Sequence, residues 1–231
     1  MPNNRLIAIC GFAGSGKDTI ANYLITRHNY EKLSFAGVLK DATAAIFGWD
    51  RAALEGDTPK GREWRETEDV WWSQRLQMPG LTPRRVLQVV GTDLFRERFH
   101  DDIWVAAVER RITNMGPSSP IVITDCRFPN EMNMIRRLGG VVWSVDRLVV
   151  RPTWFPLLAA AASREELIAA GAHPSEWLWH VALRDNKKGL EHVVIQNNGD
   201  TTELFDIVDR ELTRCPHQCL EGEGRCGGAP N

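Results

Sequence analysis

A lysine that follows a glycine-rich stretch is the residue with the clearest chemistry in this sequence. Residues 11–17 read Gly-Phe-Ala-Gly-Ser-Gly-Lys, after an apolar run and before a helical pattern. In a G-x-x-x-x-G-K loop, the glycines let backbone N–H groups approach an anion, and the following helix directs its N-terminal dipole at the same place. The sequence therefore predicts a phosphate-binding loop for a nucleotide, with Lys17 near the β- and γ-phosphates.

One position departs from the usual loop. The residue after the lysine is usually Ser or Thr, whose hydroxyl binds Mg²⁺, but here it is Asp18, followed by Thr19. Because a carboxylate can serve Mg²⁺ directly or through a water molecule, Asp18 is the candidate metal ligand. We expect ATP and Mg²⁺ as the cofactors, held by Gly11, Gly14, Ser15, Gly16, Lys17, Asp18 and Thr19.

An acid and a base follow the most clearly buried strand of the chain. The β-branched run 121–124 ends at Asp125, and Arg127 comes two residues later. Open parallel sheets place their ligand sites at the carboxyl ends of the strands, so this pair is an active-site candidate. The alternative is a structural ion pair that closes the strand.

Further basic residues could form a second anion site. Lys40 lies early in a predicted helix at the mouth of the sheet, although a lysine there is also a common surface residue. Arg84, Gln88 and Arg96 share a helix face if the helix that begins at residue 82 continues past residue 91. That face would combine bidentate phosphate recognition with an amide that can read a base edge; the alternative is surface arginines in ion pairs along the helix.

The elements that position these groups alternate between strands and helices, which indicates an α/β fold. We expect strands at 6–10, 32–35, 121–125, 141–145 and 192–195. We expect helices at 19–27, 36–47, 82–96, 102–115, 130–138, 157–170 and 202–213. Residues 49–81 are predicted to be an irregular insertion or mobile subdomain, and 148–190 have the size and position of a lid.

Composition narrows the classes of function. The 231 residues and formal net charge of −2 fit one α/β domain and disfavour a general nucleic-acid binder, which is usually basic. No apolar stretch approaches membrane-spanning length, and the start of the sequence leads into a strand rather than a signal peptide. An odd number of cysteines, five, with Cys10 and Cys126 in predicted strands, suggests a reducing cytoplasm.

Two groups of residues could bind metal but match no strong signature. Cys215, Cys219 and Cys226 lie in the Gly- and Pro-rich tail 215–231, which we expect to be flexible. Their spacing neither predicts nor excludes a zinc site. His173 and Glu176 have no further ligands around them, so a structural role is expected for that pair.

Taken together, these motifs resemble the deoxynucleoside monophosphate kinases of tailed bacteriophages. The most specific stretches are Leu87-Gln88-Val89-Val90-Gly91-Thr92-Asp93 and Asp125-Cys126-Arg127. The remaining matches are Gly16-Lys17-Asp18-Thr19, Ala36-Gly37-Val38-Leu39-Lys40-Asp41, Arg65-Glu66-Thr67, Trp104-Val105, Arg147, His173-Pro174-Ser175-Glu176 and Ile195-Gln196-Asn197-Asn198-Gly199. They occur in family order over nearly the whole chain, and the Lys-Asp-Thr ending is typical of this family.

The resemblance implies a P-loop NTPase fold of the nucleoside monophosphate kinase type. This fold has a five-stranded parallel sheet with helices on both faces, a nucleoside-monophosphate-binding subdomain and a lid. The kinase domain would span 1–214, with a substrate-binding segment at about 36–105 and a lid at about 147–190. The implied reaction moves the γ-phosphoryl group of ATP to a deoxynucleoside 5′-monophosphate, the small-molecule partner, in the cytoplasm (of a host cell, if the chain is phage-encoded).

The resemblance also gives roles to single residues. Arg65 is implied as a ligand of the substrate phosphate, within a substrate-binding set of Lys40, Arg65, Arg84, Gln88 and Arg127. Asn197-Asn198-Gly199, at the end of the last strand, is expected beside the adenine of ATP, with Asn198 as the cofactor-binding residue. The expected catalytic residues are Lys17, Asp125, Arg127 and Arg147, where Asp125 orients Arg127 or the water molecules of Mg²⁺.

Three other readings stay open at this point. The same fold could act on another phosphorylated acceptor, such as phosphomevalonate or dephospho-CoA. The chain could be an ATP-binding switch that acts through a partner, or a nucleic-acid-binding protein that uses its cysteine tail, which the acidic balance disfavours. The sequence fixes neither the accepted bases nor the oligomeric state, so a homodimer stays open.

Overall fold

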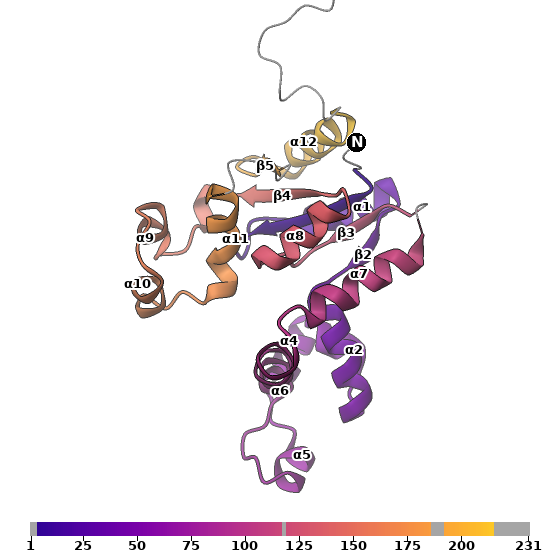
Figure 1. Ribbon diagram of the computed structural model, residues 1–231, viewed down its shortest axis with the longest axis vertical. Helices are drawn as coiled ribbons and strands as arrows, with labels where there is room; N and C mark the ends of the chain where they lie inside the picture. The colour runs from indigo at the N-terminus through magenta and orange to yellow at the C-terminus, as the bar shows by residue number, and fades with distance from the viewer. Residues whose placement is uncertain (1–3, 117–118, 186–191, 215–231) are drawn as a thin grey trace, which may run out of the picture.

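A parallel sheet forms the centre of the molecule in the computed structural model, which describes residues 4–116, 119–185 and 192–214 (Figure 1). The five strands are ordered β2 (Glu31–Leu33), β3 (Ile121–Ile123), β1 (Leu6–Gly11), β4 (Val141–Asp146) and β5 (His192–Gln196). All neighbouring strands are parallel, with β1 paired to both β3 and β4. The predicted five-stranded parallel sheet is therefore confirmed. The cysteine tail 215–231 and the last part of the predicted lid, 186–190, lie outside the described residues.

Every residue of β1 from Leu6 to Cys10 is apolar, and successive side chains point to opposite faces of the sheet, so helices cover both faces. Ile7 and Ile9 pack against α1 (Lys17–His28) and α12 (Thr201–Thr213). Leu6, Ala8 and Cys10 belong to the opposite core, with α7 (Ile103–Met115), α8 (Pro129–Arg137) and α11 (Pro174–Asp185). Because side chains alternate along a strand, an uninterrupted apolar run is what two covered faces require.

The segment after β2 forms a second, smaller packing unit, drawn below the sheet in Figure 1. It contains α2 (Phe35–Phe47), α3 (Arg51–Glu55), α4 (Pro59–Glu66), α5 (Val70–Arg75) and α6 (Pro83–Gln88). The prediction that 49–81 is irregular was wrong, since three of these helices lie within it. Each of the three begins at a side chain that caps its N-terminus, namely Asp50, Thr58 and Asp69. Trp49, Leu54, Leu81 and Val86 form a small core of their own.

The helix after residue 82 continues past Gly91, which is the condition for Arg84, Gln88 and Arg96 to share a face, but its geometry changes. From Val89 to Phe99 the chain forms a π-helix, η1. The backbone oxygen of Gly91 accepts a hydrogen bond from the indole nitrogen of Trp104 at 2.9 Å. This bond ties the π-helix to α7, and π-helical turns of this kind are frequent at functional sites.

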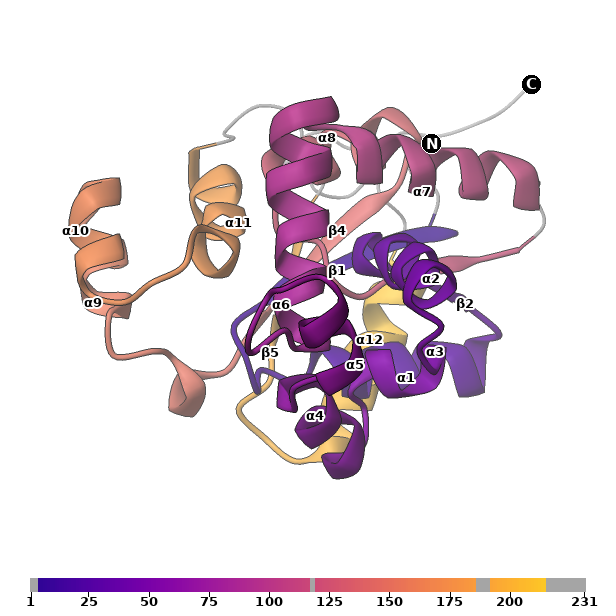
Figure 2. The ribbon, with the colours of Figure 1, turned by 90° about the horizontal axis from the view of Figure 1, so that it is seen from below.

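The segment after β4 leaves the sheet and returns to it. It contains η2 (Leu148–Val150), α9 (Phe155–Ala159), α10 (Arg164–Ala169) and α11, and Figure 2 shows α9 and α10 beyond α11. The single helix predicted at 157–170 was wrong, because the chain breaks between α9 and α10. Ala161 takes a left-handed conformation (φ 57°), and Ser163 begins α10 with a capping box that includes Glu166. Among the described residues, no helix is long and apolar enough to cross a membrane.

Candidate active site

The predicted phosphate loop lies where β1 ends and α1 begins. The ammonium of Lys17 folds back over this loop and donates hydrogen bonds to the backbone oxygens of Gly11 (2.9 Å) and Phe12 (2.7 Å). Burial lowers the pKa of Lys17; the Asp18 carboxylate opposes that effect, and the positive charge of Arg127 adds to it. The loop thus carries the positive charge of the Lys17 ammonium close to its backbone.

The conformation of the loop suits a phosphate group. Gly11 and Gly16 have positive φ angles, and a Cβ atom on them would lie 2.6 Å from the Val145 oxygen and 2.3 Å from the Asn197 amide nitrogen. The Ser15 hydroxyl is buried and has no hydrogen-bond partner within the described part of the chain. A buried hydroxyl is costly without a partner, so a phosphate oxygen fits this position.

The other side of the loop faces α12 across a cavity of about 420 Å³. The predicted residues Gly14, Gly16, Lys17, Asp18, Thr19 and Arg147 all line this cavity. Asp18 and Thr19 are exposed and offer oxygen atoms, the donor type that Mg²⁺ prefers. Among the described residues, no group of three or more His, Cys, Asp and Glu side chains could hold a metal ion.

The turn after β5, which the sequence predicts to lie near the adenine, approaches the loop through Asn197. The side-chain nitrogen of Asn197 donates to the backbone oxygen of Ser15 at 2.7 Å, and Asn197 lines the cavity. The predicted residue Asn198 is exposed, and its side-chain oxygen accepts from the Leu148 N–H at 3.0 Å. The turn therefore joins the phosphate loop to the start of η2.

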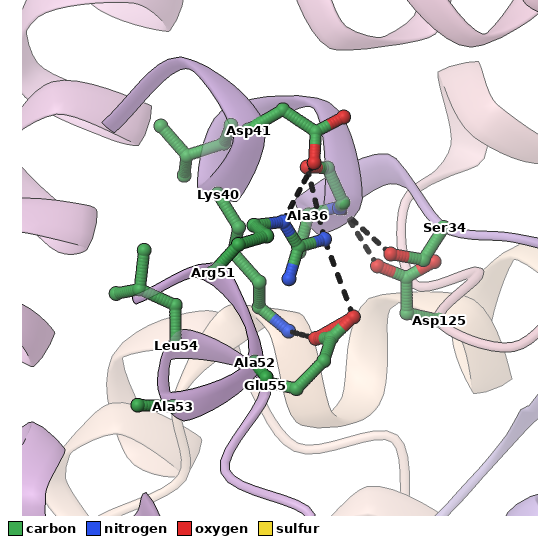
Figure 3. Close-up of polar contacts among 12 residues, drawn as sticks. Ser34, Ala36, Lys40, Asp41, Arg51, Ala52, Ala53, Leu54, Glu55 and Asp125 are labelled. Atoms are coloured by element: carbon green, nitrogen blue, oxygen red, sulfur yellow. Dashed lines mark hydrogen bonds and ion pairs between the residues drawn. The ribbon is translucent and has the colours of Figure 1, made fainter. Parts of the chain in front are cut away.

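Asp125 holds the beginning of α2 (Figure 3). Its two carboxylate oxygens accept hydrogen bonds from the backbone N–H groups of Phe35 and Ala36, each at 2.9 Å. Burial raises the pKa of Asp125, while these backbone donors lower it. The sequence predicts that Asp125 orients Arg127 or water molecules on Mg²⁺. In the structure, the carboxylate holds the start of α2, because the end of β3 lies beside it. The role of Asp125 toward Arg127 or Mg²⁺ stays a prediction.

Arg127 lies between two cavities. One is lined by Gly11, Phe12 and Lys17 of the phosphate loop, and the other, of about 1030 Å³, extends toward α2 and α6. The larger cavity brings together every residue predicted to bind the substrate, namely Lys40, Arg65, Arg84, Gln88 and Arg127. Residues far apart in the sequence thus form one cationic chamber beside the phosphate loop.

Comparison with known proteins identifies the family. A family model described as deoxynucleotide monophosphate kinase matches residues 65–152. One relative is a protein of Acanthamoeba polyphaga mimivirus that is named provisionally as a deoxynucleotide monophosphate kinase. It is 36% identical to this chain over 213 residues, which cover 88% of this chain and 93% of that protein. The chain belongs to the deoxynucleotide monophosphate kinase family.

A more distant relative agrees with the family. The deoxynucleoside-5′-monophosphate kinase of Escherichia phage T5 is 26% identical over 219 residues, covering 74% of this chain and 83% of that enzyme. A solved dephospho-CoA kinase from Campylobacter jejuni aligns over 90% of this chain and 95% of its own, at 10% identity and a TM-score of 0.45. Family membership confirms the resemblance and makes the chain a nucleotide kinase, so the other acceptors, the switch and the nucleic-acid binder are not favoured.

In this kinase, one buried acid of the large cavity was missed by the sequence analysis. Glu131 is 2% exposed, accepts from the N–H groups of Arg127 (2.7 Å) and Phe128 (3.0 Å), and pairs with Arg96 at 3.1 Å. Burial and the nearby Asp125 charge raise the pKa of Glu131 to about 7, against the lowering effect of its donors. The only sequence signal was a glutamate at the third position of a helix, which is also an ordinary cap.

The other predicted residues have contacts that fix their side chains. Arg84 is exposed and pairs with Glu66 at 2.7 Å. The imidazole of His173 contacts the Ser175 hydroxyl at 2.8 Å, and the Glu176 carboxylate accepts from the His173 N–H at 3.0 Å. His173 and Glu176 thus form a helix-start turn at α11, the structural role expected for them.

Proposed function

We propose that this chain transfers the γ-phosphoryl group of ATP to a deoxynucleoside 5′-monophosphate, giving ADP and the deoxynucleoside diphosphate. The observation that carries this proposal is the position of Arg127, which lines both the phosphate-loop cavity and the larger cationic cavity. A phosphoryl acceptor in the larger cavity and a donor on the loop would meet at this guanidinium. This is the arrangement that direct transfer between two phosphates requires.

The chain's own residues would act mainly by position and charge. The acceptor phosphate is already ionised, so no strong general base is needed. We assign the donor phosphates to the loop from Gly11 to Thr19, with Lys17 following the γ-group as it moves. Arg127 and Arg147 would stabilise the charge that develops on the transferring group. Asp125 would keep α2, and with it Lys40, in place beside the cavity.

Magnesium fits the donor side of the site. We infer that Asp18, with Thr19 beside it, holds Mg²⁺ directly or through water, since both present exposed oxygen atoms next to the loop. When bound, Mg²⁺ neutralises charge on the β- and γ-phosphate oxygens. The turn at 197–199 would lie near the adenosine part of ATP, with Asn197 rather than Asn198 in contact with the loop.

Two segments would complete the site around the substrates. We propose residues 36–105 as the substrate-binding segment and the described part of 147–190 as a lid. Lys40, Arg65 and Arg84 from the first face Arg164 and His173 from the second across the large cavity. Closure would exclude water, whose attack would waste ATP. Cys10 and Cys126 are buried free thiols, which suits a reaction in the cytoplasm of a host cell.

The test is a screen of phosphoryl acceptors. ADP formation from Mg-ATP is measured with dAMP, dCMP, dGMP and dTMP, with the four ribonucleotides, with dephospho-CoA and without acceptor. We expect turnover with one or more deoxynucleotides and only slow ADP formation without acceptor. Turnover that does not depend on a deoxynucleotide would overturn the proposal.

A further inference from the structure

The corner formed by Leu54, Glu55 and Gly56 at the end of α3 holds Lys40, a cation of the large cavity (Figure 3). The carboxylate of Glu55 pairs with the ammonium of Lys40 and also accepts from Arg51 at 3.3 Å. The Lys40 side chain is 14% exposed and that of Glu55 is 28% exposed, so solvent screens this pair less than an ordinary surface ion pair. Lys40 lines the cavity, and Glu55 lies behind it.

The corner is itself fixed by a chain of alternating charges. Arg51 donates to Asp41 at 2.6 Å, and Arg111 of α7 pairs with the second oxygen of the same carboxylate. Burial alone would raise the pKa of Glu55, but the adjacent Lys40 and Arg51 charges outweigh it and lower that pKa. The Glu55 carboxylate is therefore ionised and held between α2 and α3 at neutral pH.

The backbone of the same corner holds Arg65. One terminal nitrogen of the Arg65 guanidinium donates to the backbone oxygens of Leu54 (3.5 Å) and Glu55 (3.4 Å). The guanidinium lies so close to Gly56 that a Cβ atom there would be 2.5 Å from its central carbon. The Nε of Arg65 is buried and has no hydrogen-bond partner in the described part of the chain. Because an unpaired buried donor is costly, its position beside the cavity points to an anionic ligand.

We propose that Glu55 is a positioning residue for the phosphoryl acceptor, because it holds Lys40 on the cavity wall at a fixed place relative to Arg65. The inference rests on the proposed function. A free lysine side chain loses rotamer entropy when it binds a phosphate, and the Glu55 pair removes that cost before the acceptor arrives. An ammonium has three N–H donors, so Lys40 keeps donors for the acceptor phosphate while it is paired.

Steady-state kinetics of Glu55→Gln tests the proposal, since glutamine keeps the shape of the side chain and removes its charge. With the deoxynucleotide that wild type phosphorylates, we expect its KM to rise about tenfold, while the KM for ATP stays within about twofold. Glu63→Gln changes an exposed glutamate on α4 and is the matched control, with both constants unchanged. In a Lys40→Met background, Glu55→Gln should add less than about twofold, because the two residues act as one unit.

Two results would overturn the positioning role. An unchanged or lower acceptor KM in Glu55→Gln would mean that the carboxylate does not place Lys40, and an undiminished effect in the Lys40→Met background would mean a general structural role. If Glu55→Gln does not fold, Glu55→Asp replaces it, since a carboxylate that is one methylene shorter should also raise the acceptor KM. Failure of the proposed function is distinguishable, because wild type itself would then phosphorylate no deoxynucleotide.

Discussion

Lys17 is the residue on which phosphoryl transfer should depend most strongly. Its ammonium donates hydrogen bonds to two backbone oxygens of the phosphate loop, and burial lowers its pKa. Because phosphate oxygens are negatively charged, they would be stronger acceptors for this buried cation than those carbonyl oxygens. Because preorganised charge at the transferring group is usually the largest catalytic term, we expect Lys17→Ala to lower kcat by about 10³-fold or more.

Transfer by Lys17→Ala is measured as ADP formation with a saturating acceptor. Lys32→Ala, which removes an exposed lysine of β2, is the control and should keep wild-type kcat. Retention of near-normal activity in Lys17→Ala would show that the loop lysine is not part of the machinery.

Glu131 should make stability depend on pH. Its pKa in the folded state is about 7, above the ordinary value of 4.5, so the folded protein binds more protons than the unfolded chain between these values. Stability should therefore fall as pH rises through this window and level off above it. At 1.36 kcal/mol per pKa unit, the loss attributable to Glu131 is about 3 kcal/mol.

Urea unfolding of wild type and Glu131→Gln between about pH 5 and 8 measures this effect as a difference, since glutamine does not titrate. Asp125 interacts with Glu131, so the difference between the two proteins reports the coupled titration of both carboxyl groups. If the two free energies of unfolding run parallel across the range, the Glu131 carboxyl is ionised throughout and the assignment is wrong.

The basic residues of the large cavity could be predicted from the sequence better than the acidic residue that pairs with one of them. Lys40, Arg84 and Arg127 could be selected because basic residues in a chain with a phosphate loop are candidate anion ligands, whereas Arg65 came from the family resemblance. Glu131 could not be selected, because its role depends on burial and on an ion pair with Arg96, which is distant in the sequence. Contacts of that kind arise only when the chain folds.

Among the elements, β1, β3 and β4 could be predicted well because each is a short apolar run buried on both faces. The segment 49–81 could not, since its short helices depend on caps and on tryptophan packing rather than on a long periodic pattern. The break between α9 and α10 was hidden for a related reason. Residues 159–162 are all alanine, the best helix former, and tertiary packing overrides that preference.

That break leads to a prediction about stability. Ala161 has a left-handed backbone (φ 57°), a conformation that costs roughly 1–2 kcal/mol for a residue with a Cβ atom. We therefore expect Ala161→Gly to raise the free energy of unfolding by about 1 kcal/mol, after the extra entropy of an unfolded glycine is subtracted. Urea denaturation measures it.

The control for Ala161→Gly comes from the same run of alanines. Ala159→Gly changes the last residue of α9, where the backbone is helical, and should lower stability slightly. A loss of stability in both variants would contradict the proposed strain at Ala161.

On the scale of the whole molecule, the phosphate loop and the acceptor cavity meet at Arg127. A single compound that carries adenosine and the accepted deoxynucleoside at the two ends of a pentaphosphate should therefore occupy both cavities at once. Because linking two ligands makes the second binding event intramolecular, we expect its Kd to be at least about 10²-fold below that of either nucleotide. Calorimetric titration measures all three affinities.

Arg127→Ala should remove much of that gain, since Arg127 is a cation that lines both cavities, and it should also lower kcat by about 10²-fold or more. Arg136→Ala, on the exposed face of α8, is the control and should bind the linked compound as wild type does. Linked binding no tighter than the better single nucleotide would mean that the two cavities are not filled together. Tight linked binding that survives Arg127→Ala would instead place the junction at another residue, with Lys17, the cation of the loop that lines the smaller cavity, as the next candidate.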